Sequence, residues 1–196
     1  RVTSEAMGLP KRRATYEDIV NLPENLVGEL IDGELFTSPR PRMRHAIVAG
    51  EVFGDLRDGF NGPPGDRGQP GGWWIVMEPE LHLGDDVLVP DLAGWRRERL
   101  PQPDLDAVAQ AIPPDWACEV LSPSTGRLDR VKKLPVYARA GIPHVWLVDP
   151  ANQTLEVFEL DGDHWIVAAT HAADDRARIA PFGALELSLA RWWPEG

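Results

Sequence analysis

Two carboxylates lie inside unusually apolar segments of this chain. Asp91 lies in a predicted strand, and Glu119 lies in the middle of a nearly continuous apolar run from Trp116 to Leu121. Because a buried carboxylate without a partner is costly, each acid needs a compensating group, although Asp91 alone could simply accept a hydrogen bond at a bend. If the two strands are neighbours, both side chains can project to one end of the sheet. Two hard oxygen ligands, with a main-chain carbonyl and water, then form a site for Mg²⁺ or Mn²⁺.

A lysine lies on the helix that is predicted to follow the Glu119 strand. Asp129, Lys133 and Tyr137 recur at intervals of four residues, so they share one face of this helix. Lys133 could therefore reach back to the carboxylates, where an amine would stabilise the charge that develops on a phosphoryl oxygen. Pro135 disfavours a straight helix, so the reach of Lys133 depends on whether the helix kinks or begins late. This set predicts a metal-dependent phosphodiesterase, with the two carboxylates as metal ligands and the lysine as the third catalytic group.

Several of these residues have a plainer interpretation. Lys133 could pair with Asp129 in an exposed salt bridge that is worth little energy. His45, which opens another predicted helix, could be a solvated or capping histidine. Glu78 and Glu80 could be edge acids that face water, or either could add to the site.

The elements that position these residues are predicted from hydrophobic periodicity and turn residues. In the first half of the chain they are a helix over 14–23, a hairpin turning at Asp32-Gly33, a helix over 44–56, and strands over 73–83 and 87–95. In the second half they are buried strands over 116–121 and 144–148, a helix over 124–140, and antiparallel strands over 155–160, 164–169 and 185–189. A surface excursion over 96–114, with room for a helical turn, separates the halves. The strand–helix–strand order predicts a right-handed parallel crossover in an α/β fold.

Length and composition limit the possible functions. The chain has 196 residues without a visible repeat or linker, so residues 15–196 are predicted to form a single domain after a flexible lead-in over 1–14. The net charge of −11 argues against a protein that coats nucleic acid through bulk charge, although acids gathered at a metal site become favourable once a cation binds. The single cysteine, Cys118, favours a reducing cytoplasmic compartment. Because no apolar stretch approaches the roughly 20 residues of a membrane helix, no membrane partner is expected.

Several motifs occur in an order and spacing that resemble a known family. They are Glu29-Leu30-Ile31-Asp32-Gly33-Glu34-Leu35, Ser38-Pro39 with Arg44-His45, Val89-Pro90-Asp91, the run from Glu119 to Thr125, Asp129 with Lys133, the run from Tyr137 to Gly141, and the run from Trp146 to Pro150. Together they resemble the Uma2 family of the PD-(D/E)XK nuclease superfamily, over roughly residues 15 to 192. The resemblance implies a restriction-endonuclease-like mixed central sheet flanked by helices, with extra antiparallel strands at both ends. It also implies a divalent cation and endonuclease activity.

The resemblance also assigns residues to the site. It gives the acidic, metal-binding pair to Asp91 and Glu119. The superfamily lysine two positions after the glutamate would fall on Leu121, so the resemblance implies that the lysine has moved to Lys133 on the helix. The auxiliary candidates are Glu29, His45, Glu80 and Asp129, of which the first two fall on positions that the family motif favours.

The residues and the resemblance leave three functions open. The first is a metal-dependent endonuclease that hydrolyses DNA phosphodiester bonds, as a homodimer because two strands need two sites. The second is a catalytically weak binding or regulatory module on the same fold, which the −11 charge favours. The third is a metal phosphodiesterase for small substrates, which an acidic surface suits better than long DNA. A local basic patch near the site could still be formed by the arginines of the chain, namely Arg40, Arg42, Arg44, Arg96, Arg97, Arg99, Arg127 and Arg130.

Overall fold

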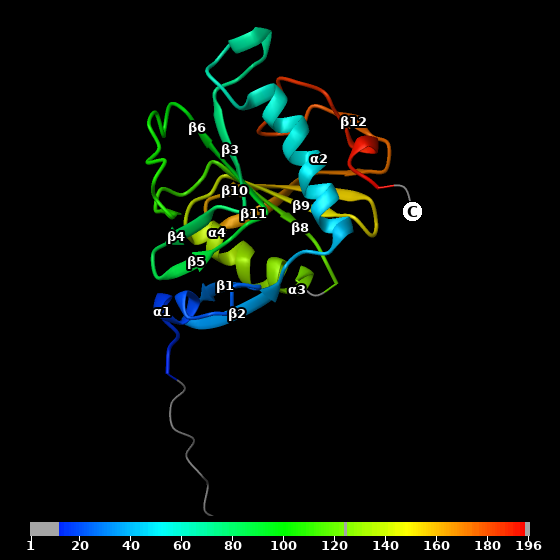
Figure 1. The fold of residues 1–196 in the computed structure, drawn as a ribbon. Helices are drawn as coiled ribbons and strands as arrows, with labels where there is room; N and C mark the ends of the chain where they lie inside the picture. Colours follow the sequence, from blue (N-terminus) through cyan, green and yellow to red (C-terminus); the bar gives the residue numbers. More distant parts are fainter. Residues whose placement is uncertain (1–11, 124, 195–196) are drawn as a thin grey trace, which may run out of the picture.

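Two β-sheets dominate the structure, a computed structural model that describes residues 12–123 and 125–194 (Figure 1). The larger sheet has six strands in the order β11–β10–β9–β8–β6–β3, and the smaller sheet has five in the order β2–β1–β5–β4–β7. The strands of the larger sheet are β3 (Trp73–Met77), β6 (Leu92–Arg96), β8 (Trp116–Val120), β9 (His144–Asp149), β10 (Thr154–Asp161) and β11 (His164–Ala172). Those of the smaller sheet are β1 (Leu26–Ile31), β2 (Glu34–Pro39), β4 (Glu80–Leu83), β5 (Asp86–Leu88) and β7 (Ala109–Gln110). The predicted mixed α/β fold is confirmed.

The larger sheet is covered on both faces. The side chains of β8 alternate between these faces, and this alternation decides toward which face Glu119 points. Trp116, Cys118 and Val120 pack with α2 (Met43–Phe60) in one hydrophobic cluster. Ala117 packs on the opposite face with residues of α4 (Leu134–Arg139). Because successive side chains of a strand point to opposite faces, Glu119 shares the α4 face with Ala117. The continuous apolar character of β8 therefore reflects burial on two sides.

Two prolines divide the predicted long strands where the chain passes between the sheets. Residues 73–83 form β3 and β4, and residues 87–95 form β5 and part of β6, rather than one strand each. Pro79 and Pro90 lie in the two breaks, and because proline lacks a backbone donor neither continues a ladder. β3 pairs with β6 in the larger sheet, whereas β4 pairs with β5 in the smaller sheet. The prediction that Asp91 lies inside a strand is therefore wrong, because it lies in the bend between β5 and β6.

The helix after β8 is continuous, but its turns widen around the candidate site residues. α3 (Gly126–Leu128) leads into a π-helical segment, η2 (Asp129–Lys133), and then into α4. Pro135 lies at the start of α4, where its missing donor and its ring would disturb a regular α-helix. A wider π turn lets the helix pass this proline, and such turns are frequent at functional sites. The predicted helix is confirmed from residue 126, while the predicted start at Ser124 lies outside the described residues.

The N-terminal elements agree with the predicted helix and hairpin. α1 (Tyr16–Val20) follows its cap residue Thr15, and β1 pairs with β2 across the turn at Asp32-Gly33. Both turn residues have positive φ, of 53° and 79°, as a tight two-residue hairpin turn requires. Of the predicted lead-in, residues 12–14 are described, and the Ala14 N–H donates to the Gly33 carbonyl of this hairpin at 2.9 Å. The rest of the predicted lead-in, residues 1–11, lies outside the described residues.

The C-terminal part confirms the predicted parallel pairing of the two buried strands and corrects two details. β8 and β9 are parallel neighbours, and β10 and β11 extend the sheet as antiparallel strands. The strand predicted over 185–189 is only β13 (Leu187–Ser188), paired with β12 (Arg176–Ala177), before the 3₁₀ turn η3 (Leu189–Arg191). The excursion over 96–114 contains β7 and no helix among its residues, because its regular part pairs with β4. No helix in the described ranges 12–123 and 125–194 is long and apolar enough to cross a membrane.

Candidate active site

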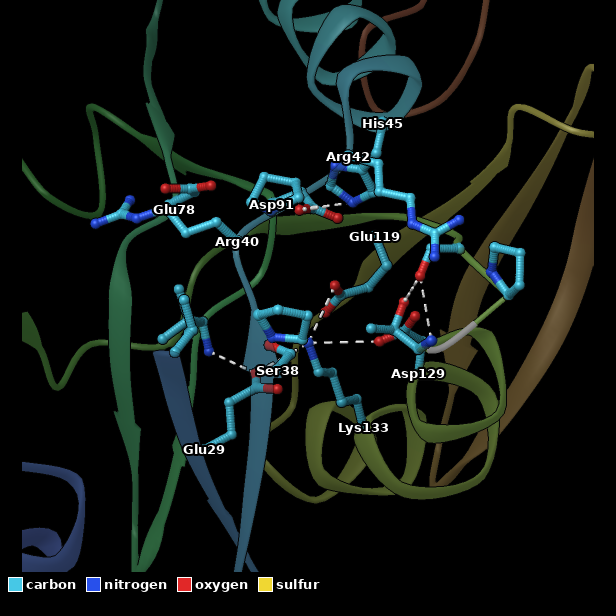
Figure 2. A pocket seen from close by; sticks show the side chains of 17 residues that line it. Glu29, Ser38, Arg40, Arg42, His45, Glu78, Asp91, Glu119, Asp129 and Lys133 are labelled. Atoms are coloured by element: carbon cyan, nitrogen blue, oxygen red, sulfur yellow. Dashed lines mark hydrogen bonds and ion pairs between the residues drawn. The ribbon is translucent and has the colours of Figure 1, made fainter. Parts of the chain in front are cut away.

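A pocket of about 390 Å³ opens between the two sheets, beside the first turn of α2 and the turn η2 (Figure 2). It contains the two acids and the lysine that the sequence singled out, and Figure 2 shows Asp91, Glu119 and Lys133 converging there. The residues that line it are Val27, Glu29, Ser38, Pro39, Arg40, Pro41, Arg42, His45, Glu78, Val89, Asp91, Glu119, Ser122, Pro123, Thr125, Asp129 and Lys133. The pocket therefore collects polar groups from both sheets and from two helical segments.

Asp91 is positioned by the break between β5 and β6. One of its carboxylate oxygens accepts a hydrogen bond from the Val120 N–H at 2.6 Å. The other lies 3.2 Å from Nε2 of His45, in the first turn of α2. Since Val120 directly follows Glu119 in β8, this anchoring brings the two acids side by side at the same end of the larger sheet. The two carboxylates are therefore close together, as expected. Cation binding by them stays a prediction.

Lys133 is the centre of a buried group of carboxylates. Its Nζ lies 2.9 Å from Glu29, 3.2 Å from Glu119 and 3.4 Å from Asp129. Its side chain is only 6% exposed, so the interpretation of the Asp129 pair as an exposed salt bridge is wrong. Tyr137 donates a hydrogen bond to the remaining oxygen of Glu119. The predicted common face of Asp129, Lys133 and Tyr137 thus points at β8.

The auxiliary candidates Glu29 and His45 both line the pocket. Glu29 is held by Lys133 and by the Val89 N–H, which donates to it at 2.8 Å. His45 contacts Asp91, its side chain is 13% exposed, and the N-cap of α2 is Arg42, so His45 is neither solvated nor a helix cap. Glu29 and His45 therefore belong to the pocket through different carboxylate contacts.

Glu80 lies outside the pocket. It accepts a hydrogen bond from the Tyr16 hydroxyl at 2.7 Å and lies 2.8 Å from Nε2 of His82. Glu78, two residues earlier in the break between β3 and β4, lines the pocket instead. The proline between them was the sequence signal that could have separated these two acids, because it ends β3 and redirects the chain.

Burial and the crowding of acids shift protonation in the pocket. Burial raises the pKa of Glu119 well above its usual value; the ammonium of Lys133 opposes this shift, and the neighbouring carboxylates add to it. Burial likewise raises the pKa of Asp129 to about 6. For Lys133, burial favours the neutral form, but Glu119, Glu29 and Asp129 outweigh it and raise the pKa of the amine. Lys133 therefore stays protonated at neutral pH, which suits it to stabilise negative charge and not to act as a base.

The donor set fits a divalent cation. Several carboxylates share one buried ammonium, and an additional positive charge would relieve their repulsion. Among the described residues, each oxygen of Asp91 and Glu119 has one partner, so each carboxylate retains acceptor capacity. In the described part of the chain, no three or more His, Cys, Asp or Glu side chains form a ready metal cluster. A cation held by Asp91 and Glu119 would complete its shell with water and a main-chain carbonyl, as Mg²⁺ commonly does.

The raised pKa of Asp129 predicts how stability depends on pH in the metal-free protein. Its pKa is about 6 in the folded state against 3.8 for an ordinary aspartate, so between these values the folded state binds more protons than the unfolded chain. The free energy of unfolding should therefore fall as the pH rises from 3.8 to about 6, by about 3 kcal/mol from this residue, and should level off above that range. Urea denaturation in EDTA at a series of pH values measures this slope. Asp129→Asn should flatten it, and an unchanged slope would contradict the assignment.

Comparison with known proteins places the chain in a family. The Uma2 profile, described as "Putative restriction endonuclease", matches residues 14–190. A solved structure, "a putative nuclease belonging to DUF820 from Anabaena variabilis ATCC 29413", is 23% identical with a TM-score of 0.70, over 91% of this chain and 97% of that chain. This likeness shows a shared fold. No curated protein matches the sequence. Since the family match spans most of its length, the chain belongs to the Uma2 family.

Proposed function

We propose that this chain is a Mg²⁺- or Mn²⁺-dependent endonuclease that hydrolyses DNA phosphodiester bonds. The observation that carries the proposal is the convergence of Asp91, Glu119 and the charged Lys133 in one pocket. The description of the Uma2 family, and that of the structure from Anabaena variabilis as a nuclease, support the same class of reaction. Hydrolysis of a phosphodiester needs stabilisation of negative charge at phosphorus, and this pocket offers an ammonium beside two potential metal ligands.

Each residue of the set has a separate task in this proposal. Asp91 and Glu119 would hold the cation, which when bound lowers the pKa of water and acts as a Lewis acid toward the phosphate. His45 orients Asp91: burial opposes protonation of His45, but the hydrogen bond and charge of Asp91 outweigh it and raise the pKa of the imidazole. Lys133 donates hydrogen bonds to a phosphoryl oxygen as negative charge develops there. Glu29 holds the amine in place.

Plasmid DNA tests the proposal directly. The protein is expected to nick or linearise supercoiled plasmid with Mn²⁺ or Mg²⁺ and to leave it intact in EDTA. Calorimetry should show that Asp91→Asn lowers the affinity for Mn²⁺ by at least about tenfold, because a charged ligand is lost. Asp85→Asn, which changes an exposed aspartate outside the pocket, is the matched control and should bind Mn²⁺ like the wild type. Intact plasmid under all metal conditions would rule out the endonuclease.

A metal phosphodiesterase for small substrates is the second candidate. A pocket of about 390 Å³ is within the range of small-molecule sites, and a chain with a net charge of −11 repels long polyanions. Hydrolysis of bis(p-nitrophenyl) phosphate together with intact plasmid would favour this candidate. If Mn²⁺ binds but neither substrate is hydrolysed, a binding or regulatory module is favoured.

The oligomeric state is part of the same proposal. Cutting both strands of a duplex needs two active sites, so we expect a homodimer of single-domain subunits in a reducing, cytoplasmic compartment. Sedimentation of the protein with and without a DNA duplex measures the assembly. A monomer that only nicks DNA would remove the dimer from the proposal and leave the chemistry in place.

A further inference from the structure

Arginines stand at the mouth of the pocket without carboxylate partners. Arg40 and Arg42 line it, both are exposed, and neither guanidinium forms an ion pair or side-chain hydrogen bond with another described residue. Some arginines elsewhere are paired with carboxylates, for example Arg99 with Asp115 at 2.8 Å and Arg139 with Asp32 and Asp86 at 2.9 Å. In a chain of net charge −11, unpaired guanidinium groups beside an acidic pocket suggest an anionic ligand.

The local charge around these arginines is opposite to that of the whole chain. No acidic residue occurs from Leu35 to Gly50, although acidic residues outnumber basic ones 31 to 20 overall. The helix α2 begins directly after Arg42, and its first turn has neither an acidic residue nor a side-chain cap. Its free N–H groups therefore add positive partial charge at the same edge of the pocket. One side of the site attracts anions even though the protein as a whole repels them.

The connection that carries the arginines is short and stiff. β2 ends at Pro39 and α2 begins at Met43, so only three residues join them. Pro41 lies between the arginines, and with Pro39 it restricts the backbone on both sides of Arg40. Figure 2 shows the Arg40 side chain extending toward Glu78, and that of Arg42 extending on the other side of the pocket, toward Asp129. The cluster of Asp91, Glu119 and Lys133 thus lies between the two guanidinium groups in that view.

We infer that Arg40 and Arg42 bind the backbone phosphates on either side of the scissile phosphodiester, and so position a nucleic-acid strand across the pocket. The inference rests on the proposed function for the identity of the scissile group. A guanidinium presents a planar fork of donors that matches phosphate oxygens, and it stays charged at any physiological pH. Two phosphate contacts from one stiff segment would fix the register of the strand without reading its sequence. This also explains how an acidic protein can engage DNA, since the contact is local.

The test measures duplex binding while cleavage is prevented. A short fluorescein-labelled DNA duplex is titrated with protein in Ca²⁺, in place of Mg²⁺ or Mn²⁺, at several salt concentrations. The double variant Arg40→Ala/Arg42→Ala should bind about tenfold to a hundredfold more weakly. Its plot of log affinity against log salt should be shallower by about 2, since each lost phosphate contact removes about 0.9 from the slope. Arg57→Ala, at the other end of α2 and outside the pocket, should match the wild type.

Two further experiments complete the test. One separates the effect of charge from an effect on folding, and the other separates binding of backbone phosphate from binding of free phosphate. Arg40→Lys/Arg42→Lys keeps both charges, so it should retain the salt slope with a smaller loss of affinity. Inorganic phosphate added at constant ionic strength should not displace the duplex from the wild type. Displacement by inorganic phosphate would overturn the assignment to a nucleic-acid backbone. Wild-type affinity and slope in the double alanine variant, or no duplex binding by the wild type, would overturn the inference itself.

The inference and the proposed function can fail separately. If the wild type cleaves DNA in Mn²⁺ and the double alanine variant has an unchanged KM, the arginines do not position substrate and the endonuclease stands. If the salt slope depends on both arginines but no DNA is cleaved with any divalent cation, the binding site stands and the endonuclease does not. The expected kinetic result is a raised KM with kcat nearly unchanged, because the arginines contact phosphates that do not react.

Discussion

Glu119→Gln is expected to reduce cleavage of plasmid DNA by about a hundredfold to a thousandfold while the protein stays folded. Glutamine has the shape of glutamate; its carbonyl oxygen can accept from Lys133 while its amide group donates to the Tyr137 hydroxyl oxygen. It removes one of the two charged ligands proposed for the cation and leaves Lys133 in the pocket. Initial rates of supercoiled plasmid loss in Mn²⁺ measure the effect.

The stability of the same variant separates lost chemistry from lost structure. Burial raises the pKa of Glu119, so the ionised side chain is a cost to the folded state at neutral pH, and its neutral replacement should not lower the free energy of unfolding. Lys133 keeps Glu29 and Asp129 as partners. Glu51→Gln, on the exposed side of α2, is the matched control and should cleave like the wild type. Wild-type cleavage by a folded Glu119→Gln would remove Glu119 from the mechanism.

The main elements of the fold could be predicted because their signals are local. Periodicity gave α2, β8, β9 and the helix between them, and the Asp32-Gly33 pair gave the first hairpin. The division of strands between two sheets was not predicted, because an apolar segment interrupted by proline resembles one long strand until its partners are known. Pro79 and Pro90 were the available signals. The second break shapes the candidate site, because it places Asp91 beside Glu119.

The sequence predicted which residues belong to the candidate site, but not which of them contact one another. The spacing of Asp129, Lys133 and Tyr137 predicted a common face, and the apolar neighbours of Glu119 predicted that it needs a partner. Lys133 contacts three carboxylates because η2 packs between the two sheets. Local sequence patterns cannot predict this packing. The contact of His45 with Asp91 likewise depends on where α2 crosses the larger sheet.

Lys133→Met is expected to lower the free energy of unfolding at neutral pH by about 3–5 kcal/mol and to abolish cleavage. Methionine fills much of the volume of the lysine stem but removes the only cation that contacts Glu29, Glu119 and Asp129 among the described residues. Three buried carboxylates would then lack compensation. Urea denaturation in EDTA measures the loss. Lys132→Met, at the neighbouring and more exposed position, is the matched control and should change stability by less than about 0.5 kcal/mol.

The pH dependence of that loss decides whether carboxylate charge is its cause. The pKa of Lys133 is raised in the folded protein, so its contribution is fully present at neutral pH and would be lost only at strongly alkaline pH. As the pH falls through about 6, Asp129 takes up a proton, so the penalty for removing the ammonium should shrink. The difference in stability between wild type and Lys133→Met should therefore be smaller near pH 4.5 than near pH 7.5, whereas a packing defect would cost the same at both. Mn²⁺ bound by Asp91 and Glu119 should restore part of the lost stability at neutral pH, because it supplies positive charge to the same carboxylates.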